Sequence, residues 1–142
     1  MRLKDGVNML GVNWRLRQAM IEAERVYDRF GVELVITSLN DGRHGYMSFH
    51  YFGLAMDLRT RDFKDKKQSV DATLVLKDEL RSINPYFDVV LERNHIHVEF
   101  DIKRAEIHAN RRHGCSLYSL GAHGLPPSGE SGGKETSPEG DG

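Results

Sequence analysis

The chain of 142 residues carries 20 basic and 21 acidic side chains, for a formal net charge of −1. This balance leaves no cationic excess to bind a phosphate backbone, so we expect no nucleic-acid partner. The one cysteine, Cys115, excludes an intramolecular disulfide. No apolar run approaches the roughly 18 residues of a membrane span, and the N-terminus lacks the apolar core of a signal peptide. We therefore expect synthesis in the cytoplasm without a signal peptide, and no membrane insertion.

The composition divides the chain into a folded domain and a tail. Residues 1–113 contain the periodic apolar patterns, and we expect them to form one domain that acts as a monomer. Beyond residue 113 the composition shifts, and glycine, serine, proline, glutamate and lysine dominate residues 126–142. Such a segment buries too little apolar surface to offset the entropy of folding, so residues 114–142 are expected to be a disordered tail.

The first part of the chain predicts a helix, a strand and a loop. Apolar residues recur at helical spacing over residues 13–30, with Asn13 as the N-cap and Gly31 as the stop. Residues 32–37, VELVIT, are short and β-branched and predict a strand. Residues 39–48 are rich in asparagine, aspartate and glycine and predict a loop, and residues 54–60 alternate as a second strand.

A second helix and a hairpin are predicted next. Residues 69–84 form the helix, with Val70, Leu74 and Leu80 along its apolar line and Pro85 ending it. Residues 87–100 predict a β-hairpin with a two-residue turn at Arg93 and Asn94. Residues 102–112 predict a short last helix. Together these elements predict an α+β fold, a small central antiparallel sheet flanked by helices.

The predicted hairpin separates apolar from polar side chains. Residues that flank a two-residue turn pair directly and point to the same side, so Glu92 faces His95, and His97 follows on that side. The opposite face is apolar and carries Val89, Leu91, Ile96, Val98 and Phe100. One face therefore packs on a core, and the other gathers one carboxylate and two imidazoles.

A second polar segment, SFHYFGLAMD, places His50 and Asp57 seven positions apart. On one flat strand they would face opposite sides, so the chain must bend between them, and Gly53 is where a bend costs least. His50 and Asp57 with one histidine of the hairpin make a three-ligand zinc set that leaves a fourth position open. Spacing alone does not distinguish His95 from His97 as that ligand.

Other polar residues near this segment are candidates for catalysis or substrate binding. Glu92 is a candidate general base, because a carboxylate beside a catalytic metal can remove a proton from water. Its alternative is an ordinary surface residue at a hairpin tip. Arg43 could bind a substrate carboxylate through a bidentate contact. Taken alone, His44 would be solvent-exposed, and Ser48 would bond to the backbone or to a ligand.

The pattern S-x-H-x-x-G-x-A-x-D, followed by H-x-H at His95 and His97, resembles the D-alanyl-D-alanine carboxypeptidase family of zinc peptidases. That family shares a clan with murein endopeptidases and the hedgehog signalling domain, and the similarity covers residues 36–100. The resemblance implies one zinc ion on His50, Asp57 and His97, which would make residues 1–113 a zinc peptidase domain. It also implies His95 as a transition-state contact and Glu92 as the base. His44 matches a further histidine of the hedgehog-like relatives.

The resemblance implies a peptidoglycan stem or cross-bridge peptide as the substrate, cleaved by a carboxypeptidase or an endopeptidase. A short single domain of this kind is similar to phage or prophage endolysins, which a separate membrane protein releases to the cell wall. One position departs from the family: three residues before the last histidine, where many relatives have glutamate, this chain has Asn94. The alternative function is a non-catalytic, zinc-stabilised module that binds a wall peptide or a protein.

Overall fold

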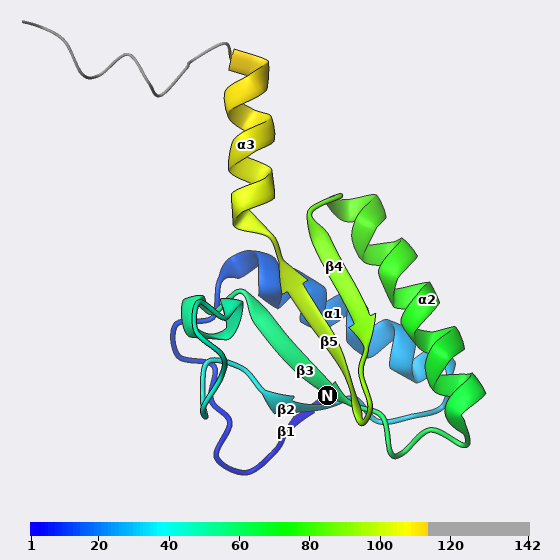
Figure 1. Ribbon diagram of the computed structural model, residues 1–142. Coiled ribbons are helices and arrows are strands. Elements are labelled where there is room, and N and C mark those ends of the chain that lie inside the picture. The colour runs from blue at the N-terminus through cyan, green and yellow to red at the C-terminus, as the bar shows by residue number, and fades with distance from the viewer. Residues whose placement is uncertain (114–142) are drawn as a thin grey trace, which may run out of the picture.

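The structure, a computed structural model, describes residues 1–113, with side chains through residue 107 (Figure 1). Its elements are β1 (Arg2–Leu3), α1 (Trp14–Arg29), β2 (Val35–Ser38), the 3₁₀ helix η1 (Phe49–Phe52), β3 (Ala55–Arg59), α2 (Lys66–Ile83), β4 (Phe87–Leu91), β5 (His95–Phe100) and α3 (Ile102–His113). The predicted α+β class is confirmed. The tail predicted at residues 114–142 lies outside the described residues.

The five strands form one sheet in the order β1-β2-β3-β5-β4. The four longer strands pair antiparallel, as predicted, and β1 adds a short parallel strand at one edge, which was not predicted. Helices α1 and α2 pack against each other and cover one face of the sheet, while α3 projects from the end of β5 (Figure 1). No helix within residues 1–113 has the length and apolar character needed to cross a bilayer.

Helix α1 follows its sequence signals closely. The Asn13 side chain accepts a hydrogen bond from the backbone N–H of Arg15 at 3.0 Å, which satisfies one of the free donors of the first turn. At the other end Gly31 takes the left-handed conformation that stops a helix, with φ +69°. The side chains buried against the sheet are Leu16, Ala19, Met20, Ala23, Val26 and Tyr27.

Helix α2 differs from its prediction in start and in orientation. It begins at Lys66, three residues early, because the Asp65 side chain caps it by accepting from the Gln68 N–H at 2.7 Å. The predicted apolar line was only partly right: Leu80 is buried, but Leu74 is 56% exposed and Val70 is only half-buried. The line that packs inward consists mainly of small residues, which allow a close approach to α1 and β4: Ser69, Ala72, Thr73, Leu76 and Leu80.

The predicted hairpin is confirmed. Strands β4 and β5 pair with Leu91 opposite Ile96, and the Glu92 N–H donates to the His95 carbonyl at 2.9 Å across the two-residue turn. The apolar face of the hairpin packs into the core, where Val89, Ile96, Val98 and Phe100 are buried. Its polar face is turned away from α1 and is available for a site.

The segment before β3 bends by a different route from the one predicted. His50 does not lie on a bent strand; it lies in η1, a single 3₁₀ turn that Gly53 closes with φ +63°. The Asn13 N–H donates to the Gly53 carbonyl at 3.0 Å, so this turn is fixed by the residues that precede α1. A Cβ atom at position 53 would overlap the carbonyl oxygen of Gly11. Gly53 is therefore required both for its dihedral angle and for space.

We expect Gly53→Ala to lower the free energy of unfolding by about 3 kcal/mol, from the left-handed conformation and the overlap together. Gly31→Ala is the matched control, because Gly31 has φ +69° and no atom within 4 Å of the added methyl group. It should cost about 1–2 kcal/mol, the conformational part alone. Urea unfolding of both variants measures the difference, and equal losses would contradict the proposed contact with Gly11.

Candidate metal centre

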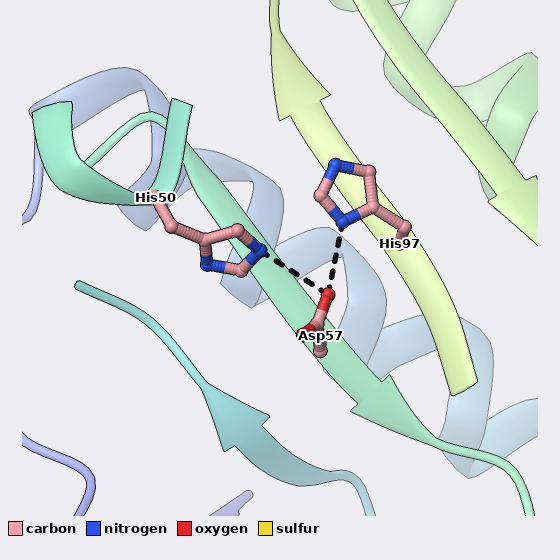
Figure 2. Close-up of side chains that lie close together, drawn as sticks. All are labelled: His50, Asp57 and His97. Carbon is pink, nitrogen blue, oxygen red and sulfur yellow. Dashed lines mark hydrogen bonds and ion pairs between the residues drawn. The ribbon is translucent and has the colours of Figure 1, made fainter. Parts of the chain in front are cut away.

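Three side chains from three elements meet on the polar face of the sheet (Figure 2). Asp57 on β3 and His97 on β5 are direct cross-strand partners, and His50 reaches them from η1. The Asp57 Oδ1 atom lies 2.9 Å from His97 Nδ1 and 3.3 Å from His50 Nε2. One ligand atom from each residue lies within 4.8 Å of the other two. This group could hold a metal ion, as predicted from the sequence.

The second nitrogen of each histidine is held from outside the site. His50 Nδ1 donates to the carbonyl of Leu39, and His97 Nε2 lies 3.1 Å from Glu99 Oε2. The Leu39 carbonyl and the Glu99 carboxylate are both acceptors, so His50 Nδ1 and His97 Nε2 each carry a proton. When the ring is neutral, its other nitrogen therefore has a lone pair that points into the site. Metal-ligating histidines are oriented in this way by carbonyls and carboxylates. The donor set and its surroundings therefore fit a divalent metal ion.

Without a metal, the site is a network of hydrogen bonds around the Asp57 carboxylate. Burial would raise the pKa of Asp57, but hydrogen bonds from His50 and His97 outweigh it and hold that pKa below its usual range. Hydrogen bonds to Asp57 and Glu99 outweigh desolvation and raise the pKa of His97 to about 9. A metal must therefore displace a proton from His97, so metal affinity should fall as the solution becomes more acidic.

His95 and Glu92 lie beside the three-residue group without completing it. His95 Nε2 is 3.4 Å from Asp57 Oδ1 and 3.5 Å from Glu92 Oε2. Its other nitrogen, Nδ1, bonds to the Asn94 side chain at 2.9 Å. His97 is nearer to Asp57 and has a carboxylate behind it, so the geometry favours His97 over His95 as the ligand. His95 and the half-exposed Glu92 line the open pocket beside the group.

The candidate metal group lines an open pocket of about 330 Å³, and the predicted residues of the preceding loop line it too. Arg43 lines it and is exposed. Ser48 also lines it and caps η1, where its hydroxyl accepts from the His50 N–H at 3.4 Å. The ring of His44 stacks on that of His50 with centroids 3.9 Å apart, and its Nε2 donates to the Asp41 carbonyl at 2.6 Å. His44 therefore supports a ligand ring through packing.

Two supporting groups were not identified from the sequence. Glu99 was assigned no role, and the structure places it behind His97 as its orienting carboxylate. Its position two residues after His97 on one strand puts both side chains on the same face, and that spacing could have indicated the contact. The Leu39 carbonyl behind His50 carries no signal in the sequence, because any residue could supply it.

No protein-family model, no curated protein and no solved structure matches the chain. The similarity to zinc peptidases therefore consists of the motif residues alone. A function of the chain is therefore inferred from the chemistry of the site that these residues form.

The metal-free chain should lose stability as the pH rises from 6.5 to above 9. Folding raises the pKa of His97 to about 9, so its ion pairs stabilise the fold fully below pH 6.5 and are lost as the pH passes through about 9. We expect His97 to contribute on the order of 2 kcal/mol to this loss. The lowered pKa of Asp57 acts in the opposite direction and makes its stabilisation disappear only in strong acid.

Urea unfolding in a chelator at pH 6 and pH 9.5 measures the effect in the wild-type chain and in His97→Gln. Other groups titrate in both proteins, so the difference between their pH dependences isolates His97. The variant should show the weaker dependence on pH. Parallel curves for the two proteins would show that His97 is not ion-paired in the folded state.

Proposed function

We propose that the chain is a zinc-dependent peptidase that cleaves a peptide bond of peptidoglycan, as a carboxypeptidase or an endopeptidase. The observation that carries this proposal is the cluster of His50, Asp57 and His97 beside the half-exposed carboxylate of Glu92 in one open pocket. Two imidazoles and one carboxylate suit zinc, and three protein ligands are typical of catalytic rather than structural zinc sites. When bound, zinc supplies Lewis acidity to the scissile carbonyl and lowers the pKa of water.

In this proposal Glu92 is the general base. It takes a proton from the attacking water and later passes that proton to the leaving amine. The other nearby carboxylate, Glu99, is held by His97 at 3.1 Å and is poorly placed for this role. Glu92 is 52% exposed and lines the pocket, so it can reach a bound substrate.

His95 and Arg43 are the proposed contacts to the substrate. The bond between His95 Nδ1 and the Asn94 side-chain oxygen holds the ring with Nε2 toward the pocket, where His95 can contact the substrate at the cleaved bond. Arg43 lines the same pocket and can bind a substrate carboxylate with two parallel hydrogen bonds. His44 and Ser48 act on His50: the first packs on its ring, and the second fixes its backbone.

The motif similarity supports a cell-wall substrate and a role in phage or prophage lysis, in which the enzyme acts after its release to the wall.

One observation favours the alternative, a zinc-stabilised module that binds without cutting. Asn94 occupies the position at which many similar peptidases carry a glutamate, so the general base depends on Glu92 at a different spacing. An assay of turnover separates the two functions.

Purified peptidoglycan treated with the chain and one equivalent of zinc should release free amino groups, and a chelator should stop the release. Glu92→Gln should lower turnover at least about 100-fold, because general base catalysis contributes about 10²–10⁴. It should still bind one zinc ion per chain, as measured by metal analysis after dialysis. Glu106→Gln, the same change at an exposed position of α3, is the matched control and should keep full turnover.

Each outcome of this assay assigns a function. Zinc binding and peptidoglycan binding without any release of amine would support the non-cutting module. Release that persists in the chelator would show that the reaction does not need the metal. Full turnover by Glu92→Gln would show that Glu92 is not the general base.

A further inference from the structure

A second cavity, of about 380 Å³, adjoins the candidate metal centre and shares Asp57 and His95 with it. Its distinguishing feature is a set of three cationic side chains: Lys4, Arg59 and Arg61. The remaining lining residues are neutral and polar: Thr37, Ser38 and Asn94. The only carboxylate in the lining is Asp57, which the histidines already engage. The cavity is therefore electropositive on the side away from the metal ligands.

The strand register places these cations beside the site. Arg59 is the cross-strand partner of His95, next to the pair of Asp57 and His97. Arg59 and Asp57 are two positions apart on β3, so their side chains leave the same face of the sheet about 6–7 Å apart. Lys4 is fixed at the far side, because its N–H donates to the Ile36 carbonyl at 2.9 Å and holds the chain against β2.

The guanidinium of Arg59 is poorly neutralised within the protein. Its side chain is only 15% exposed, yet its nearest carboxylate, Asp62, is 3.6 Å away, which is beyond a good hydrogen bond. Arg61 lies 3.7 Å from the same carboxylate, so two cations share one partner. Among the described residues, no acceptor forms a hydrogen bond with the Arg59 side chain. No side-chain nitrogen among the described residues is both buried and unpartnered, so the Arg59 donors open to the solvent of the cavity. A cation held at a cavity wall with donors directed into it favours an anionic ligand.

We propose that this cavity is a substrate subsite that binds a free carboxylate, held mainly by Arg59. The inference rests on the proposed peptidase function and extends it to a substrate class. The two cavities meet at Asp57 and His95, so a peptide lying across the metal centre passes from Arg43 on one side to Arg59 on the other. Such a substrate is an acidic peptide with carboxylates on both sides of the cleaved bond. A stem peptide whose γ-linked glutamate keeps a free α-carboxylate fits this description. The same peptide with that carboxylate converted to an amide does not.

The test compares two peptides that differ in that one group: N-acetyl-L-alanyl-γ-D-glutamyl-L-lysine and its α-amide. Binding is measured by NMR titration of the full zinc-loaded chain carrying Glu92→Gln, which prevents turnover during the titration. Adding Arg59→Gln should weaken binding of the acid about tenfold, the typical effect of losing a hydrogen bond to a charged group. It should change binding of the amide less than twofold. Arg25→Gln, which changes an exposed arginine on α1, should leave both affinities unchanged.

A second variant covers the possibility that Arg59→Gln disturbs folding, which circular dichroism would reveal. Lys4→Gln combined with Arg61→Gln changes two exposed cations and should weaken binding of the acid about threefold, with no effect on the amide. Equal affinities for acid and amide in the unsubstituted background, or equal losses for both peptides on substitution, would overturn the subsite. Wild-type release of amine from peptidoglycan is measured separately, so failure of the subsite and failure of the peptidase function give different results.

Discussion

The register of β3 on β5 is the constraint on which the rest of the structure depends. It sets Asp57 opposite His97 and Arg59 opposite His95, and so positions both the candidate metal group and the neighbouring cationic cavity. A shift of one residue would send the polar side chains of one strand into the core and bring apolar ones to the site. The register is held by burial of Met56, Leu58, Ile96 and Val98 against the helices. The same alternation therefore stabilises the fold and builds the site.

The remaining parts of the site are added to this pair of strands from outside the sheet. Gly53 closes η1 against Gly11, and η1 places His50 beside Asp57, so the segment before α1 determines where the third candidate ligand lies. Glu99 and the Leu39 carbonyl then orient the two imidazoles from behind. The result is a compact donor set with Glu92 and His95 along one side of an open pocket, an arrangement suited to an ion that keeps a position for substrate.

Features encoded by local patterns could be predicted from the sequence. The hairpin follows from alternation around Arg93 and Asn94, and this alternation also puts His95 and His97 on its polar face. His50 and Asp57 follow from ligand types in the segment before and within β3, although spacing alone did not distinguish His97 from His95 as the third member of the group. Features that depend on distant contacts could not be predicted. The single turn of η1 needs Gly11, the strand β1 needs a partner in β2, and the inner face of α2 is chosen by small residues rather than by Leu74. The cationic cavity combines Lys4 with β3, which no short-range pattern brings together.

Anomalous diffraction from crystals of the zinc-loaded chain, recorded above and below the zinc absorption edge, tests the central claim most directly. One strong peak should lie about 2.0–2.2 Å from His50 Nε2, an Asp57 carboxylate oxygen and His97 Nδ1. Zinc bound elsewhere in a fully loaded crystal, with these three side chains still bonded only to one another, would contradict the proposed centre.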